Sequence, residues 1–346
     1  MYYQIDDDYK AFDLSLVPRD ATMIRCNKRS LNSLKGCPRK TEDLDVASTS
    51  ISSLDGISSN VKKLNCDYCR ELTNISKLPE KLIYLRLSSC PIDSLPKMPN
   101  ISILDVGGTK IRRLPNLDIN QKMESLDLGY LKIDNSDLAT FPRVVEHLNI
   151  QSCPNLTSFK GCPQAKSIHC LGNSNITSFD GFPSTVVDIS LGEMPNINLL
   201  DLPTHVKKLK LYRHTATSML DIPTHIEELE LSDTRLVNFH NASKNLKKLE
   251  YSGFIKNAYG LPQTLNKLHV TYGTIQTLMG LPSVSELFVY ETNIRSNVVN
   301  CLTFGKIHGF FDRYEIKHGK IYKVKSESIF RAKLELAQQG KKLPLI

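Results

Sequence analysis

The chain repeats one pattern of apolar and polar positions every 19 to 22 residues. Each copy contains two apolar residues separated by a single residue, and we take the first of the two as the anchor of the copy. Fourteen copies are present. Their anchors are Ile24, Leu44, Leu64, Leu85, Leu104, Leu126, Leu148, Ile168, Ile189, Leu209, Leu229, Leu249, Leu268 and Leu287. A fixed period of this length is typical of a solenoid, in which short coils stack and each coil contacts only its neighbours.

The anchor pair predicts a short strand with one buried face. In the copy around Leu104, for example, Leu104 and Val106 point one way and Asp105 points the other. Further apolar residues stand three positions before the anchor, and seven or eight and ten or eleven positions after it, as Ile111 and Leu114 do here. We therefore expect one short strand per coil, with these other residues closing the far side.

Proline stands five or six residues before the anchor in eleven of the fourteen copies. These prolines are Pro18, Pro38, Pro79, Pro99, Pro142, Pro163, Pro183, Pro203, Pro223, Pro262 and Pro282. Because proline fixes φ and cannot donate a backbone hydrogen bond, it belongs on the segment that returns to the strand rather than in the strand. A coil of this length has no room for a full helix there, so we expect extended or 3₁₀ return segments.

The repeat resembles the leucine-rich-repeat superfamily, in its short bacterial type with a Leu-Pro return segment. The stretch from Leu95-Pro96 through Leu104 and Val106 to Leu114-Pro115 is similar to the repeat of secreted bacterial leucine-rich effectors. The resemblance covers about 280 of 346 residues. It implies an α/β-solenoid class that is mostly β: a leucine-rich-repeat horseshoe with a parallel concave sheet and a non-helical, extended or 3₁₀ convex side. The ubiquitin-ligase domain of some of those effectors is not expected, since no Cys-x-Asp occurs.

The chain departs from this family at the position five residues after the anchor. There the family carries an asparagine that connects successive coils, whereas this chain carries mostly threonine or cysteine. The residues are Thr49, Cys69, Cys90, Thr109, Cys153, Asn173, Thr234 and Thr292. All three side-chain types can donate to a neighbouring carbonyl, so we expect this ladder to persist in a weaker form.

Charge separates the end of the chain from the repeats. The formal net charge is +8, and residues 301–346 carry +6 of it. We predict an N-terminal cap over 1–17, a solenoid of about 14 repeats over 18–300, and a basic C-terminal cap over 301–346. This cap would consist of a hairpin over 314–324 and a helix from Ser326 or Ser328, and would cover the apolar end of the stack.

The unburied strand face is the predicted binding surface. Six of the thirteen tyrosines fall on it, and tyrosine and arginine among mixed charges are typical of protein-binding hot spots. Tyrosine also suits a merely solvated strand, which is the alternative. The glycines at 107, 108 and 129 are expected to let a partner approach closely. The predicted partner-binding residues, centred on the last third of the repeats, are Tyr212, Arg213, Tyr272, Phe288, Tyr290, Lys210, Glu230, Asp105, Asp127 and Tyr130.

Two pairs of residues invite a chemical interpretation. Asp105 and Asp127 occupy equivalent places on neighbouring strands, and paired carboxylates can share a proton. A basic partner side chain is the favoured use of this pair. His147 and His169 are also adjacent, but Asn149 and Gln151 beside them are poor metal ligands. No Gly-rich phosphate loop, nucleophile elbow or HExxH motif occurs, so we expect no enzyme activity, cofactor or metal.

The sequence therefore predicts a non-enzymatic, monomeric solenoid that binds another protein through its concave face, with no membrane segment. Nine cysteines, an odd number, predict free thiols and a reducing compartment. We expect a cytoplasmic protein, or one delivered into a host cytoplasm as an adaptor or inhibitor of bacterial-effector, phage or viral origin. The alternative is a nucleic-acid or ribonucleoprotein binder that uses the basic C-terminal segment.

Overall fold

The computed structural model describes residues 1–5, 13–27, 29–114, 118–236, 238–255, 257–275, 280–282, 284–290, 293–294, 306–308, 313–317 and 320–324. The chain divides into two compact units, Met1–Ile189 and Ser190–Ile346. We call them unit 1 and unit 2. Strand β10 (Asp188–Gly192) contains the division.

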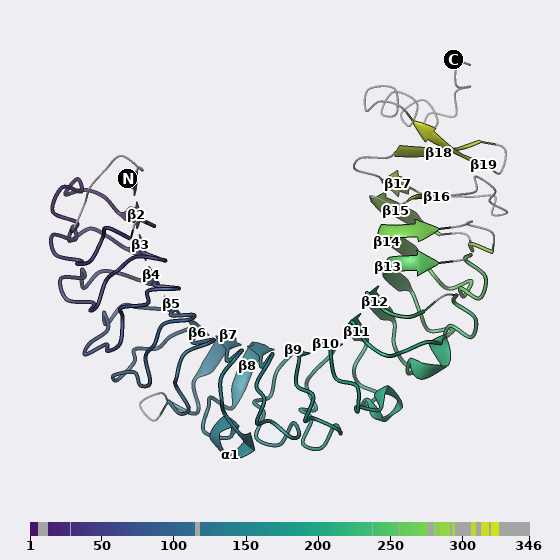
Figure 1. The fold of residues 1–346 in the computed structure, drawn as a ribbon, viewed down its shortest axis with the longest axis horizontal. Helices are drawn as coiled ribbons and strands as arrows, with labels where there is room; N and C mark the ends of the chain where they lie inside the picture. The colour runs from purple at the N-terminus through teal and green to yellow at the C-terminus, as the bar shows by residue number, and fades with distance from the viewer. Residues whose placement is uncertain are drawn as a thin grey trace. The chain divides into compact units, whose positions relative to one another are not determined.

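Unit 1 is a stack of coils that each contribute one short strand to a parallel sheet. Figure 1 shows the strands after the first one side by side in chain order. The strands of unit 1 are β1 (Tyr2–Gln4), β2 (Met23–Arg25), β3 (Asp43–Asp45), β4 (Lys63–Asn65), β5 (Tyr84–Arg86), β6 (Ile103–Asp105), β7 (Lys122–Asp127), β8 (Val144–Asn149) and β9 (Ser167–Leu171). Anchor pairs with anchor at each step, as Leu44 does with Leu64 and Leu64 with Leu85. The repeat period therefore sets the register of the sheet.

Unit 2 continues the same pattern in β11 (Lys208–Tyr212), β12 (Glu228–Ser232), β13 (Lys248–Ile255), β14 (Lys267–Ile275) and β15 (Glu286–Tyr290), which have five to nine residues each. The shorter β16 (Asn293–Ile294) and β17 (Lys306–His308) come after them. β11 to β15 pair in parallel and again in anchor register, from Leu209↔Leu229 to Leu268↔Leu287. β18 (Arg313–Lys317) and β19 (Lys320–Val324) form an antiparallel pair, as the sequence predicts for 314–324. The helix expected after Ser326 or Ser328 lies outside the described residues.

The core lies between the sheet and the return segments of each unit. In the coil that begins at Leu44, Leu44, Val46 and Ile51 are fully buried and Leu54 is 5% exposed. The same positions are buried in the other coils whose side chains the structure describes. Each coil is too small to enclose these residues alone, so its apolar surface is covered by the coils on either side. The fold is thus the mostly-β solenoid with a parallel sheet that the sequence predicts.

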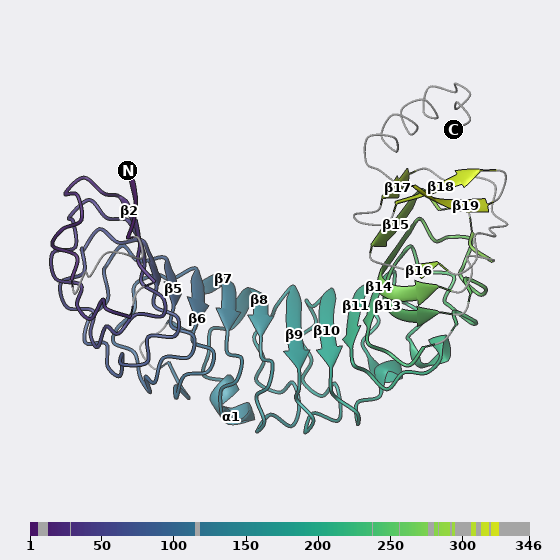
Figure 2. The same ribbon diagram turned by 45° about the horizontal axis from the view of Figure 1, so that its top comes forward.

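The return segments are almost free of helix in the described part of the chain. Helical turns there are confined to the four-residue α1 (Asn135–Leu138) and the 3₁₀ turns η1 (Leu199–Asp201) and η2 (Met219–Asp221). Figure 2 shows α1 on the side of its coil away from the strands. It occurs in one of the longest coils, from Leu126 to Leu148, and a capping box at Asp134 begins it.

The return-segment prolines close turns rather than merely ending strands. The carbonyl of Pro79 accepts a hydrogen bond from the N–H of Leu82 (3.1 Å), and that of Pro203 from the N–H of Val206 (3.1 Å). In each case the donor is the buried apolar residue three positions before the anchor. The proline turn therefore fixes how the chain re-enters the strand.

A left-handed backbone position follows the anchor in both units. The residue four after the anchor has a positive φ throughout the coils from Leu44 to Leu268. These residues are Ser48, Tyr68, Ser89, Gly108, Tyr130, Ser152, Gly172, Glu193, Arg213, Asp233, Gly253 and Tyr272. From Ser48 to Ser152 their N–H groups donate to the next coil, as Tyr68 does to the carbonyl of Ser88 (2.8 Å). The coil-to-coil hydrogen bonds offset the cost of this backbone conformation.

The side chains five residues after the anchor form the predicted ladder of hydrogen bonds. Their residue type decides which carbonyl accepts the bond. Cys69, Cys90 and Cys153 donate to carbonyls of the preceding coil at 3.0–3.2 Å, and Asn173 does so at 2.7 Å. Thr49 and Thr109 instead donate to the carbonyl three residues earlier in their own coil. The bonds to carbonyls of another coil therefore come from cysteine and asparagine, whereas the hydroxyl of Thr49 reaches the next coil only at the thiol of Cys69, 3.4 Å away.

The assignment of faces can be tested with one charge placed on either side of a strand. Leu126→Asp puts a carboxylate at a fully buried site in β7 and should lower the free energy of unfolding by about 3–5 kcal/mol. Ser125→Asp, one residue away on the open side, should change it by less than about 1 kcal/mol. Chemical denaturation followed by circular dichroism measures both. Equal losses would contradict the assignment.

Candidate functional site

Side chains that project from the sheet away from the core form a surface that we call the open sheet face. It consists of the residues one before and one after each anchor, together with the turn that follows. Along β3 these are Asp43 and Asp45, both half-buried, on either side of the buried Leu44. The face is thus built from backbone that the core holds in place, while its side chains vary from coil to coil.

In unit 1, short polar side chains on this face stabilise the turns. The residue after the anchor accepts a hydrogen bond at 2.8–3.2 Å from the N–H two residues later. These acceptors are Asp45, Asn65, Asp105, Asp127 and Asn149. Aspartate and asparagine form such turns readily. Asp105 and Asp127, predicted as partner-binding residues, therefore also have a structural role.

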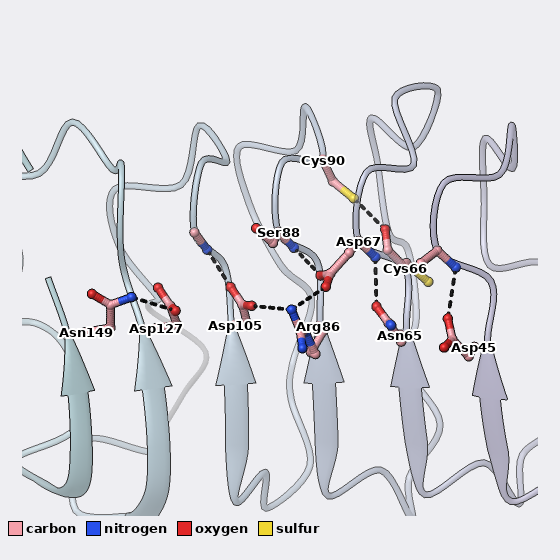
Figure 3. A network of polar contacts seen from close by, with 12 residues as sticks. Asp45, Asn65, Cys66, Asp67, Arg86, Ser88, Cys90, Asp105, Asp127 and Asn149 are labelled. Carbon is pink, nitrogen blue, oxygen red and sulfur yellow. Dashed lines mark hydrogen bonds and ion pairs between the residues drawn. The ribbon is translucent and has the colours of Figure 1, made fainter. Parts of the chain in front are cut away.

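Arg86 interrupts this series and forms the centre of a charged cluster (Figure 3). Its Nη2 lies 2.6 Å from Asp67 Oδ2 and 3.4 Å from Asp105 Oδ2. The other oxygen of Asp67 accepts from the N–H of Ser88 at 2.8 Å. One guanidinium thus links the turns of three successive coils.

The cluster continues through Asp127, whose Oδ2 accepts a hydrogen bond from Asn149 Nδ2 at 2.8 Å. Burial, followed by the nearby charge of Asp127, raises the pKa of Asp105 to about 6. Burial also raises the pKa of Asp67. Carboxylates therefore outnumber the single guanidinium here, and the surface is acidic and sensitive to mild acid.

Gly107 and Gly129 leave room for the carboxylates of this cluster. A Cβ at Gly107 would lie 3.2 Å from Asp127 Oδ1 and 3.3 Å from Asp105 Oδ1. One at Gly129 would lie 3.1 Å from Asp127 Oδ1. The space that the sequence assigns to an approaching partner is thus partly filled by the chain's own carboxylates.

In unit 2, the open sheet face carries ion pairs between neighbouring strands. Lys210 Nζ lies 3.3 Å from Glu230 Oε2, and the hydroxyl of Tyr212 donates to Glu230 Oε1 at 2.8 Å. Lys248 pairs with Glu250 along β13. Three of the predicted partner-binding residues, Lys210, Tyr212 and Glu230, therefore form one intramolecular group.

The other predicted residues lie on the turn edge of the face or on β15. Tyr272 is 63% exposed and Tyr130 60%. The Arg213 side chain is 70% exposed and lies 2.9 Å from Glu193. All three occupy the left-handed position. The ring centroid of Phe288 lies 5.4 Å from that of His269. The Tyr290 side chain lies outside the described residues.

The predicted residues are thus divided between the two units. Asp105, Asp127 and Tyr130 lie in unit 1, whereas Lys210, Tyr212, Arg213, Glu230, Tyr272, Phe288 and Tyr290 lie in unit 2. The predicted residues therefore form two surfaces, one on each unit.

The structure places the residues considered for other chemistry in ordinary contacts. His147 Nδ1 lies 2.8 Å from Ser167 Oγ. In the described residues, no three His, Cys, Asp or Glu side chains form a group that could hold a metal. None of the helices in those residues has the length and apolar character of a membrane span. The eight cysteines among them are free thiols.

Sequence reasoning missed Arg86 and Asp67 as functional candidates. The available signal was that Arg86 replaces an aspartate or asparagine at the residue after the anchor. Its long side chain allows it to reach the turns of both neighbouring coils, which a shorter residue could not do.

Comparisons with known proteins add one likeness. No family model and no curated protein sequence matches the chain. Among solved structures it is similar to YopM from Yersinia enterocolitica WA-314, with 17% sequence identity and a TM-score of 0.43. The alignment covers 89% of this chain and 60% of that one, so the chain spans about three fifths of that protein's length.

The raised pKa of Asp105 gives unit 1 a measurable pH dependence. The folded protein holds this proton more tightly than the unfolded chain, so the stability contribution is complete below about pH 4 and is lost as the pH rises through about 6. Asp105→Asn keeps an oxygen for the Gly107 N–H and removes the buried charge. It should raise the free energy of unfolding by about 1–2 kcal/mol at pH 7.5 and change it little at pH 4.

The matched control is Ser125→Asn, on the same face but at the residue before the anchor Leu126, where neither side chain titrates. Its effect should be the same at both pH values. If Asp105→Asn behaves in the same way, the carboxyl of Asp105 does not titrate as an isolated buried group.

Proposed function

We propose that the chain is a non-enzymatic solenoid that binds another protein through the open sheet face of unit 2. The observation that carries this proposal is that large exposed side chains project from a backbone that hydrogen bonds hold in place. Arg213, just after β11, and Tyr272, within β14, both have left-handed backbone and exposed side chains beside half-buried charged residues. Tyrosine and arginine of this kind supply large contact areas at interfaces.

The backbone beneath these side chains is already ordered. The N–H of Arg213 donates to the carbonyl of Ser232 at 3.0 Å, so the turn is fixed by the next coil. A tyrosine on such a turn has only its side-chain torsions left to lose on binding. Preorganisation of this sort favours affinity, because less conformational entropy is lost when the partner arrives.

The charges of the face indicate what kind of surface would fit it. Lysines and glutamates lie across from one another, as Lys208 does from Glu228, and Glu228 from Lys248. These side chains are half-buried rather than enclosed, so charge pairs of this kind contribute modestly to folding stability and can exchange partners at low cost. A protein surface with both signs of charge around an apolar or aromatic centre is therefore the expected partner.

Two further features support finer proposals. Free buried thiols such as Cys66, Cys90 and Cys170 favour a reducing compartment, which fits a cytoplasmic protein or one delivered into a host cytoplasm. The resemblance of the repeat sequence to secreted leucine-rich effectors supports a host-directed adaptor or inhibitor that acts as a monomer.

The test compares binding of one purified partner by matched variants. The partner is first identified by affinity capture from cytosol, and its Kd is then measured by calorimetry. Replacement of Tyr212 by Ala together with Tyr272 by Asn should weaken binding more than tenfold, because two aromatic anchors are lost. Asparagine tolerates the positive φ at 272, and Glu230 keeps Lys210 as a partner when Tyr212 is removed.

The control is Tyr130→Asn in unit 1, a site with the same turn conformation and nearly the same exposure. It should change the Kd by less than about twofold. A partner lost by Tyr130→Asn but kept by the double variant would place the interface in unit 1. A binding constant that falls steeply with added salt would favour the nucleic-acid alternative.

A further inference from the structure

A cavity of about 310 Å³ lies in unit 1, where three successive coils leave their strands. Its walls come from the turns after β2, β3 and β4. The residues that line it include Arg29, Ser48, Ser50, Tyr68, Arg70 and Glu71. The volume is at the small end of the range for ligand sites. The lining is polar and contains two arginines.

The repeat explains how the arginines come to be there. Arg29 stands five residues after the anchor Ile24, at the position where other coils bury a ladder residue such as Thr49, yet Arg29 is exposed. After the ladder residue Cys69, two exposed residues precede the next buried one, Leu72, whereas only Ser50 separates Thr49 from Ile51. The additional residue brings Arg70 and Glu71 to the cavity.

Neither guanidinium serves the fold. In the part of the chain that the structure describes, Arg29 and Arg70 make no ion pair or side-chain hydrogen bond, unlike Arg86 a coil away. The hydroxyls of Ser48, Ser50 and Tyr68 likewise have no partner among those residues. Thr49, which also lines the cavity, is the exception, because its hydroxyl donates to Val46. The cavity thus presents two cations and three free hydroxyls.

We propose that this cavity binds a phosphate monoester. The guanidinium group matches phosphate oxygens in a two-pronged geometry, and charge-assisted hydrogen bonds of this type are among the strongest in proteins. Serine and tyrosine hydroxyls can donate to the remaining oxygens. The exposed ring of Tyr68 offers an apolar surface to the group that carries the phosphate. A carboxylate ligand would use the arginines but leave hydroxyls unpaired.

Glu71 limits how strongly the site attracts anions. Its carboxylate lines the same cavity and brings the local charge of the three ionised side chains to +1. The site therefore should select an anion by geometry rather than by charge alone. The proposal therefore predicts opposite effects. Removal of the Glu71 charge should strengthen anion binding, whereas removal of either arginine should weaken it.

The site is separate from the interface proposed on unit 2, and its test requires no protein partner. Isothermal titration of the full chain at low ionic strength and pH 7.5 uses O-phosphoserine, O-phosphotyrosine, glucose 6-phosphate and inorganic phosphate. Arg29→Gln and Arg70→Gln should each weaken binding of the monoesters about tenfold. Glu71→Gln should strengthen it at least about twofold. Circular dichroism melting confirms that each variant is folded.

The matched control is Arg39→Gln, which removes an exposed arginine of unit 1 outside the cavity and should leave binding unchanged. Preference for the two phosphoamino acids would indicate a phosphorylated protein side chain as the source, and preference for the sugar phosphate a small molecule. Both results support the site. The proposal is overturned if no monoester binds at millimolar concentration, if inorganic phosphate alone binds, or if Arg39→Gln has the same effect as Arg70→Gln.

Discussion

A coil of about twenty residues can neither pair the backbone groups of its own strand nor bury its own apolar side chains. The rest of the structure depends on this constraint. A coil's three-residue strand has no hydrogen-bond partner within the coil, and its five or six apolar side chains cannot enclose one another. The backbone N–H of Val46 therefore donates to Asn65 in the next coil, and Leu44 is fully buried because Ile24 and Leu64 lie beside it. Each coil is folded by its neighbours, which explains why the anchors must keep register.

This dependence explains why the sequence predicts the fold so well. The core positions, the parallel register and the non-helical return segments each follow from a feature that recurs in nearly every copy, such as Leu104 with Val106 or the proline before the anchor. Recurrence allows one copy to support the reading of the next. The site is different. The link from Asp67 through Arg86 to Asp105 depends on how far three unlike side chains reach across coils. A pattern of residue types does not contain that distance.

The same difference appears in the roles assigned to single residues. Gly107 looks like a place for a partner to approach, but it makes room for the carboxylates of Asp105 and Asp127. In the sequence, Tyr212 looks like a side chain available to a partner, but its hydroxyl already donates to Glu230. Exposure at the left-handed positions, as at Tyr272, is predicted more reliably. It is set by the backbone conformation, which repeats from coil to coil, rather than by side-chain neighbours.

The left-handed position after each anchor has a consequence for how this protein can diversify over generations. From Leu44 to Leu268 that position holds serine, tyrosine, glycine, glutamate, arginine or aspartate, and never a β-branched residue. Selection for folding there acts chiefly on φ, because the side chain projects away from the core. Neighbouring coils can still be coupled at this position, since Arg213 pairs with Glu193 and Asp233 in the coils on either side. At a position whose side chain makes no such pair among the described residues, such as Tyr130, a lineage can exchange tyrosine for arginine or serine without a compensating change in the next coil, and new binding specificities can accumulate one substitution at a time.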